Sequence, residues 1–146
     1  MRRTLCVVMV AALLAACEPM GPLPGRSLSG EVSPPPQDWA PYGDTEVIQL
    51  ETSGPYSVNI WGVVSGNQYY VASAGGAEAR WAQRIERSSD VRLRIEDELF
   101  ELQAIIVTDE DELKEVAEAF NDKYDLDADE DFPEVVVYRL VPRNDG

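Results

Sequence analysis

The sequence contains no histidine, and its two cysteines, Cys6 and Cys17, both stand near the amino terminus. Without histidine the chain lacks the usual imidazole base and the commonest metal-binding side chain. A folded part without cysteine forms neither a disulfide framework nor a thiolate zinc site, and it has no thiol nucleophile. These absences exclude several enzyme classes, and we expect no metal site.

Basic residues are also scarce, with 12 Lys and Arg against 27 Asp and Glu, a net charge of −15. Such a chain repels nucleic acid and anionic lipid, so we expect no nucleic-acid partner. In contrast, the 45% of hydrophobic residues and 27% of charged residues are typical of a globular protein. A length of 146 residues therefore predicts one domain with one core.

The first residues have the pattern of an export signal. Arg2 and Arg3 precede an apolar run, residues 5–14, which is too short to cross a hydrocarbon layer of about 30 Å as a helix. The run ends in Leu-Ala-Ala before Cys17, and this lipobox resembles that of bacterial lipoproteins. The resemblance implies cleavage after residue 16 and acylation of Cys17, which leaves 130 residues in the mature chain.

Membrane lipid, bound through acylated Cys17, is therefore an expected partner. Two or three acyl chains hold a protein on a membrane even when its charge is unfavourable, because each buried methylene contributes about 0.8 kcal/mol. Cys6 leaves with the leader, so Cys17 has no disulfide partner. Glu18 stands where lipoproteins retained in an inner membrane commonly have aspartate. We expect a cell-envelope protein, on the periplasmic face of the outer membrane if the bacterium is Gram-negative.

Residues 17–43 are rich in helix and strand breakers, because seven of the ten prolines stand there. We predict a disordered spacer without strand or helix, at the end of which Trp39 and Tyr42 dock on the domain. The domain itself is predicted over residues 44–142, and residues 143–146 form a tail.

The domain shows alternating strand patterns and two helical patterns. A Ser-Gly-Asn turn joins the second and third strands. Asp109 is a predicted N-cap with Glu112 as its capping-box partner. The predicted strands are 46–52, 57–64, 68–73, 91–95, 98–107 and 135–140, and the predicted helices are 77–88 and a second one after Asp109. This order predicts an α+β fold with a small antiparallel barrel of about six strands and two main helices.

The order of short motifs over residues 47–140 resembles the split β-barrel oxidoreductases that bind flavin or deazaflavin (F420). This superfamily includes pyridoxamine-phosphate oxidases and deazaflavin-dependent nitroreductases. The motifs include NIWGVVSGNQYYVASAGG (59–76), DVRLRI (90–95), FELQAIIVTDEDEL (100–113) and the closing VVVYRL. The resemblance implies FMN or F420 as cofactor and a split-barrel fold.

The same resemblance assigns a cofactor site to the ends of several elements. Two glycines let a backbone approach a phosphate, and the next helix presents its N-terminus to it, although the loop equally suits a plain strand-to-helix connection. The two tryptophans would flank the flavin ring or pack in the core. The candidate residues are Thr52, Ser53, Trp61, Ser73, Ala74, Gly75, Gly76, Arg80, Trp81 and Arg84.

Several positions depart from the family pattern. Deazaflavin-binding members carry a basic turn after the first strand and a lysine before the glycine pair, where this chain has Ser53-Gly54-Pro55-Tyr56 and Ala74. No lysine or arginine stands between Ser27 and Ala79. Five arginines gather over residues 80–94, and they either bind an anion or pair with the many acidic residues.

The acidic stretch 125–134 has alternating carboxylates, as a calcium-binding loop does. It has Glu130 at the sixth position, where glycine is required, and Val136 at the twelfth, where glutamate is required. The stretch is therefore predicted to be a solvated acidic loop rather than a cation site.

Two functions remain open. The first is a lipid-anchored binding or envelope protein whose split barrel has lost the cofactor-phosphate site, with an apolar small ligand or an envelope protein as partner. The second is an FMN- or F420-dependent reductase of a small organic substrate, in which the cofactor supplies the chemistry. A homodimer is compatible with either function, because split barrels of this superfamily often dimerise.

Overall fold

The computed structural model describes residues 27–125 and 135–144. The predicted leader 1–16, Cys17, the acidic residues 126–134 and the last two residues lie outside the described residues. The elements follow in the order β1 (Glu31–Val32), η1 (Ala40–Tyr42), β2 (Ile48–Thr52), β3 (Tyr56–Ile60), β4 (Gly62–Ser65), β5 (Gln68–Ser73), η2 (Gly76–Glu78), α1 (Arg80–Arg87), β6 (Asp90–Ile95), β7 (Glu98–Ile106), α2 (Glu110–Tyr124) and β8 (Val136–Pro142). The predicted α+β class is confirmed.

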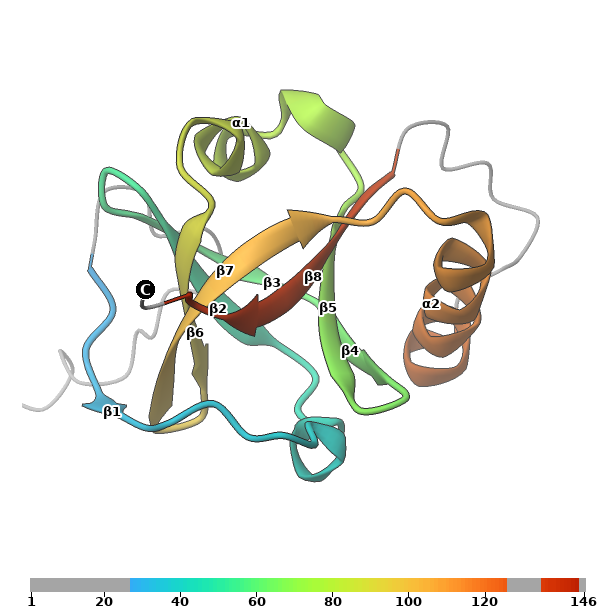
Figure 1. Ribbon diagram of the computed structural model, residues 1–146, viewed down its shortest axis with the longest axis horizontal. Helices are drawn as coiled ribbons and strands as arrows, with labels where there is room; N and C mark the ends of the chain where they lie inside the picture. Colours follow the sequence, from blue (N-terminus) through green and yellow to red (C-terminus); the bar gives the residue numbers. More distant parts are fainter. Residues whose placement is uncertain (1–26, 126–134, 145–146) are drawn as a thin grey trace, which may run out of the picture.

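Seven strands form one path of hydrogen-bonded neighbours in the order β3-β2-β6-β7-β8-β5-β4. Neighbours along this path are antiparallel, whereas the short β1 pairs with β7 in parallel. The sheet curls into a half-barrel, and its two outer strands, β3 and β4, are consecutive in the sequence (Figure 1). Buried side chains from both halves of the sheet fill the interior.

The strand predicted over residues 57–64 is in fact two strands that meet at Trp61. β3 pairs with β2 and β4 pairs with β5, so the chain leaves one hairpin for another at this point. Glycine at position 62 allows the chain to pass from β3 to β4 here, because the ring of Tyr69 packs directly onto it. A Cβ at this position would collide with the hydroxyl of Tyr69. This division, together with β1, raises the expected six strands to the eight of the described chain.

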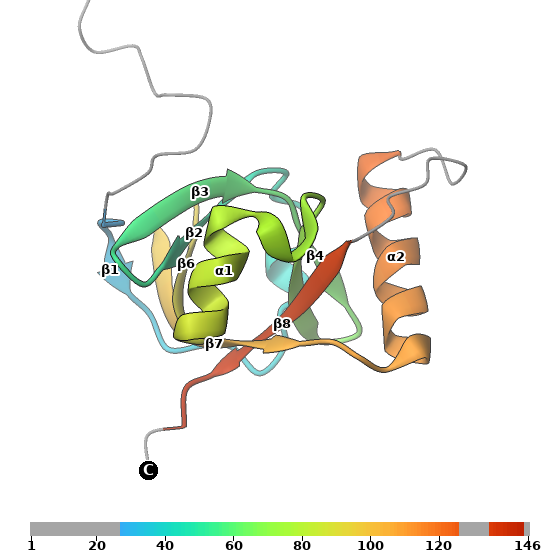
Figure 2. The ribbon, with the colours of Figure 1, turned by 90° about the horizontal axis from the view of Figure 1, so that it is seen from above.

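The two helices cover different parts of the barrel. α1 lies across one end and buries Trp81, Ala82 and Ile85, whereas α2 lies beside β4 (Figures 1 and 2). α1 starts three residues later than predicted, because the chain after β5 first forms the 3-10 turn η2. Neither helix of the described residues has the length and apolarity needed to cross a membrane.

The start of α2 confirms one prediction and corrects another. The carboxylate of Asp109 accepts the backbone N–H of Glu112 at 2.9 Å, as expected of an N-cap. The side chain of Glu112 does not complete a capping box. It instead accepts hydrogen bonds from Tyr70 and Arg139 at 2.6 Å each, and so ties the helix to the sheet.

The described part of the predicted spacer is ordered against the barrel, which corrects the expectation of a disordered segment without strand or helix. We call residues 28–43 the strap. The strap contains β1 and η1, and it runs along the end of the barrel opposite α1 (Figure 1). Leu28 is 7% exposed and Trp39 is 2% exposed. Prolines prevented a regular helix but not packing, because buried apolar surface offsets the cost of ordering an irregular chain. The predicted docking of Trp39 and Tyr42 is confirmed, because both rings contact Phe100 of β7.

Candidate functional site

The glycine loop predicted to face a phosphate lies between β5 and α1. Ser73 ends β5, and its buried hydroxyl donates a hydrogen bond to the carbonyl of Gly76 at 2.8 Å. Gly76 has a φ of +64°, which favours glycine, and it is buried, whereas Ala74 and Gly75 are exposed. The Ser73 hydroxyl therefore stabilises the loop itself and has its donor occupied within the protein.

The N-terminus of α1 follows this loop. The preceding residue, Ala79, has no side chain that caps the helix, and Arg80 at the first position is exposed. Free backbone N–H groups at a helix N-terminus favour negative charge. This end of α1 is the feature of the predicted site that remains most compatible with an anion.

Arg84 lies one turn further along α1 and holds the β2–β3 turn. Its guanidinium donates to the carbonyl of Ser53 at 2.7 Å and lies 4.8 Å from the centre of the Tyr56 ring. Gly54 has a φ of +140°, and a Cβ at this position would collide with the Arg84 guanidinium. Thr52 is buried, and its hydroxyl donates to the carbonyl of Tyr56 at 3.2 Å. The structure thus brings Thr52, Ser53 and Arg84 together, as parts of one packed turn.

Two other arginines, Arg92 and Arg94, are held by a carboxylate or by backbone carbonyls. Arg92 lies 3.4 Å from Glu51 and donates to the carbonyl of Leu28. Arg94 donates to the carbonyl of Glu96 at 3.1 Å. Arg80 and Arg87 are exposed. The ion pair of Arg92 supports charge pairing over anion binding for that member of the arginine cluster.

The two tryptophans assigned to the flavin ring have different surroundings. Trp61 is 46% exposed and stacks on Tyr124 of α2, with ring centres 4.4 Å apart and planes within 9°. Trp81 is 7% exposed and packs near Tyr138 inside the barrel, with ring centres 5.8 Å apart. Trp81 is therefore a core residue at the α1 end, while Trp61 belongs to the α2 side. Their assigned role at a flavin stays a prediction.

Polar contacts from the end of α2 fix the corner beside Trp61. The ammonium of Lys123 donates to the carbonyls of Thr45 and Gly62, at 2.7 and 2.6 Å. The hydroxyl of Tyr124 donates to the carbonyl of Glu46 at 2.7 Å. Burial lowers the pKa of Lys123, although nearby carboxylates oppose this effect. The Lys123 ammonium therefore has a structural role, holding two backbone carbonyls.

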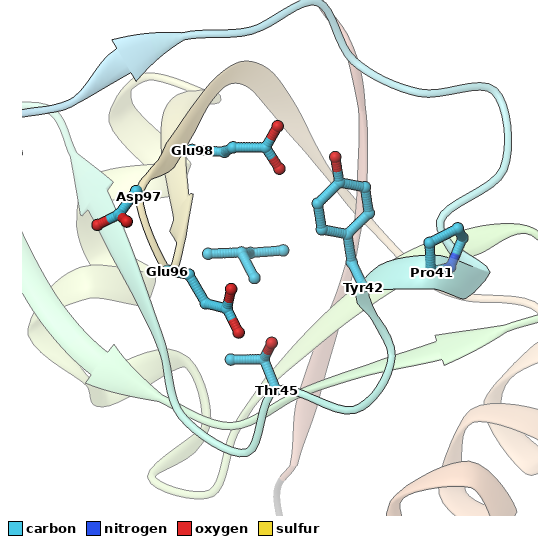
Figure 3. Close-up of a pocket in the computed structure, with 7 residues that line it drawn as sticks. Pro41, Tyr42, Thr45, Glu96, Asp97 and Glu98 are labelled. Atoms are coloured by element: carbon cyan, nitrogen blue, oxygen red, sulfur yellow. The ribbon is translucent and has the colours of Figure 1, made fainter.

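A cavity of about 340 Å³ lies at the strap end of the barrel (Figure 3). Carboxylates from the β6–β7 turn line one side, and η1 with the residues after it lines the other. A hydrogen bond to Glu98 raises the pKa of Tyr42, with burial contributing in the same direction. The lining residues are Pro41, Tyr42, Thr45, Ile95, Glu96, Asp97 and Glu98. This lining contains no basic side chain and disfavours a phosphate.

Among residues 27–125 and 135–144, no three or more acidic, histidine or cysteine side chains are arranged so that they could hold a metal ion, and this includes the carboxylates at the cavity. Of the acidic stretch 125–134, Asp125 is described and the other residues lie outside the described residues. Asp125 caps α2 in the left-handed conformation, with a φ of 51°.

An aromatic cluster at the strap end was not predicted as a site. Trp39 lies 5.4 Å from Tyr69 and 5.0 Å from Phe100, measured between ring centres. Tyr69 and Phe100 are fully buried, and the hydroxyl of Tyr69 has no hydrogen-bond partner among the described residues. Burial raises the pKa of Tyr69 far above its ordinary value. The only signal in the sequence was one tryptophan between prolines.

Residues 45–139 match the sequence model of a family described as an uncharacterized protein conserved in bacteria (DUF2255). The chain belongs to this family. The whole strap lies before the matched region. A search of curated proteins found no match.

Solved structures with the same fold include a Listeria innocua protein described as a candidate pyridoxamine 5′-phosphate oxidase. It is 21% identical, with a TM-score of 0.55, and the match covers 67% of this chain and 84% of that one. The Agrobacterium tumefaciens protein Atu2129, of unknown function, is 15% identical with a TM-score of 0.52, and the match covers 68% of this chain and 49% of that one. An F420 reductase matches at 16% identity over 75% of this chain and 95% of that one, with a TM-score of 0.49. The DUF2255 domain is thus a split barrel, as predicted.

The residues at the glycine loop fit a flavin phosphate poorly. A phosphate needs arginine or lysine to balance its charge when it leaves water. The guanidinium of Arg84 is engaged with Ser53 and Tyr56, and position 74 is an exposed alanine. Arg80 and the uncapped start of α1 are the donors that remain there.

Proposed function

We propose that this DUF2255 protein is a lipid-anchored split barrel that has lost the cofactor-phosphate site and acts as a binding protein of the cell envelope. The observation that carries the proposal is the placement of Arg84. Its guanidinium holds the Ser53 carbonyl at 2.7 Å and covers the Tyr56 ring, so it serves the fold. A phosphate that recruited Arg84 would leave a half-buried carbonyl without its partner.

Charge elsewhere in the domain supports the same proposal. The cavity at the strap end carries Glu96, Asp97 and Glu98 on one turn, and it repels an anion. The whole chain has a net charge of −15. An apolar small ligand or an envelope protein partner is compatible with these surfaces, whereas a phosphorylated cofactor is not.

The anchor is proposed at Cys17, on the evidence of the lipobox. The strap reaches the barrel at Leu28, where the backbone N–H donates to the carboxylate of Glu51. Only residues 17–27 separate the lipid from Leu28, the first buried side chain among the described residues, and an extended chain of about ten residues spans roughly 36 Å at most. The barrel would therefore stay close to the membrane surface.

A reductase is the second candidate, and one observation favours it. The N-terminus of α1 has no side-chain cap, it follows the glycine pair, and Arg80 is exposed beside it. An anion could use these donors. The Listeria innocua protein named for pyridoxamine 5′-phosphate oxidation has the same fold. In this alternative FMN or F420 would supply the hydride chemistry.

A cofactor titration separates the two candidates. The chain from Glu18 to Gly146 keeps every described residue, and it would be titrated with FMN and with F420 while visible absorbance and fluorescence are recorded. We expect no saturable binding up to millimolar concentrations. A stoichiometric coloured complex at micromolar cofactor would overturn the loss of the phosphate site. In that case Arg80→Ala should weaken the complex, and Arg87→Ala serves as the matched control.

The anchor is tested separately in the full-length chain. Replacing Cys17 by serine removes the thiol that accepts the lipid, so the protein should leave the membrane fraction. Cys6→Ser is the matched control and should change nothing, because Cys6 belongs to the leader. If the Cys17→Ser protein still sediments with membranes that have been washed with high salt, the anchor lies elsewhere.

A further inference from the structure

The strap contacts the barrel at Leu28, at β1 and at Trp39. Leu28 and Trp39 are its buried residues, and the prolines at 34–36 between them are exposed or half-buried. β1 pairs with β7 over only two residues. A segment that is held by few buried contacts opens at lower free energy than the core does.

Few backbone hydrogen bonds join the strap to the barrel. The N–H of Ser33 donates to the carbonyl of Leu99 at 2.8 Å, and the N–H of Trp39 donates to the carbonyl of Asn67 at 3.1 Å. The three prolines between these points have no N–H to donate. The Trp39 side chain is thus held mainly by its packing, with one backbone bond beside it.

The barrel interior beneath the strap is lined by aromatic side chains. The Trp39 ring fills it against Tyr69 and Phe100, both 0% exposed. Interiors are closely packed, so removing this ring would leave an apolar space of its own size. The family match begins at residue 45, and this end of the shared barrel is therefore closed by a segment that precedes the match.

We propose that the strap is a displaceable plug, and that an apolar, ring-containing ligand without negative charge binds in the barrel where Trp39 now lies. This inference rests on the proposed binding function and names the ligand class for it. The carboxylates of Glu96 and Glu98 at the same end of the barrel exclude an anionic ligand. The apparent affinity is then set by the fraction of molecules in which the strap is open.

Loosening the strap without touching the core tests this proposal. Ser33→Pro removes the N–H that binds Leu99, and the position follows an extended residue, which proline accepts. Ser33→Ala keeps that N–H and is the matched control. Hydrogen exchange at the Trp39 amide reports strap opening, and the amides of β2 and β6 report global unfolding. The neutral aromatic probe N-phenyl-1-naphthylamine reports binding through its fluorescence. Both are measured on residues 18–146.

In the wild-type chain we expect the Trp39 amide to exchange faster than the β2 and β6 amides. Ser33→Pro should speed that exchange about tenfold, equivalent to about 1.4 kcal/mol, and should tighten probe binding by the same factor. Ser33→Ala should change neither quantity. In Trp39→Ala, which creates the space directly, indole should bind and raise the unfolding temperature.

Two results would overturn the proposal that the strap is a displaceable plug. One is exchange at Trp39 that equals global unfolding in the wild-type chain and in Ser33→Pro. The other is faster exchange at Trp39 with unchanged probe binding. Neither result depends on cofactor binding. Saturable FMN binding would contradict the proposed function and leave the measurement of strap opening unaffected.

Discussion

The two ends of the barrel are closed in different ways. At one end α1 buries Trp81 and Ile85 from a regular helix inside the family-matched region. At the other end an irregular strap, which precedes that region, inserts Trp39. The first end is rich in arginine, and the second carries the carboxylates of the β6–β7 turn.

The two ends therefore differ in how the closing segment satisfies its backbone hydrogen bonds and in how much packing it needs. A helix satisfies most of its own backbone hydrogen bonds and needs only one apolar face for packing, and α1 lies inside the matched region. An irregular strap lacks the repeating backbone hydrogen bonds of a helix, so each of its backbone groups needs a separate partner. Such a segment is stable only where a large side chain is buried. The helix end is where the family resemblance places a cofactor, and the strap end is closed by residues that precede the matched region.

The largest effect is expected from removing the two buried tryptophans. Trp39→Ala and Trp81→Ala should each lower the free energy of unfolding by about 3–5 kcal/mol, because both leave a cavity in a packed interior. Urea denaturation followed by far-UV circular dichroism measures this quantity.

Trp61→Ala is the matched control for both variants. Trp61 is 46% exposed, and its loss removes mainly the stacking on Tyr124, so we expect about 1 kcal/mol. If Trp39→Ala cost no more than Trp61→Ala, the strap end would not be part of the core. The comparison between the two ends would then fail.

A smaller effect is expected at the α1 end from Arg84→Ala. This variant loses a hydrogen bond to the Ser53 carbonyl and the contact with the Tyr56 ring, so stability should fall by about 1–2 kcal/mol. Arg87→Ala, on the same helix but exposed, should stay within about 0.5 kcal/mol of the wild type. Equal stability of the two variants in urea denaturation would show that Arg84 is free for another role.

Acid should weaken the junction between α2 and the sheet, where Glu112 accepts hydrogen bonds from Tyr70 and Arg139. Hydrogen bonds from Tyr70 and Arg139 hold the pKa of Glu112 below its ordinary value. The stability it contributes is therefore complete above the unfolded-state pKa, near 4.3, and is lost as pH falls through the lower folded-state pKa. Wild type should exceed Glu112→Gln by about 1–2 kcal/mol at pH 7, and this difference should shrink below about pH 4.

Alkali should also weaken the junction between α2 and the sheet, through loss of the proton of the Tyr70 hydroxyl that is hydrogen-bonded to Glu112. Burial, with the hydrogen bond to Glu112, raises the pKa of Tyr70 to about 12. Its contribution is present below the unfolded-state pKa near 10 and is lost as pH rises towards 12. Tyr70→Phe should therefore remove part of the stability loss between these values in urea denaturation. A loss that is unchanged in Tyr70→Phe would assign the alkaline transition to other groups.

The smallest effect is expected beneath the strap from Tyr69→Phe. The hydroxyl of Tyr69 is buried without a partner in the described chain, so its removal should be neutral or should stabilise the fold by up to about 1 kcal/mol. Tyr138→Phe, near Trp81, is the corresponding change at the α1 end. Clear destabilisation by Tyr69→Phe would reveal a partner for the hydroxyl.

Much of the fold could be predicted from local patterns. β5 was predicted residue for residue, and the N-cap at Asp109 was predicted from its position before a helical repeat. The break at Trp61 was missed, because alternation continues through it and only the packing of Tyr69 on Gly62 explains it. Of the predicted site, the sequence grouped Thr52, Ser53 and Arg84 through the family resemblance, but it could not tell that Arg84 binds a backbone carbonyl.

By itself the sequence determined the α+β barrel, the absence of thiol and imidazole chemistry in the folded part, and the excess of negative charge. Periodicity and composition are local properties, and they can be read without knowing which segments meet. Only the tertiary structure decided that a proline-rich segment closes the barrel with Trp39 and that Arg84 is occupied. Both depend on contacts between residues far apart in the chain, which no local pattern records.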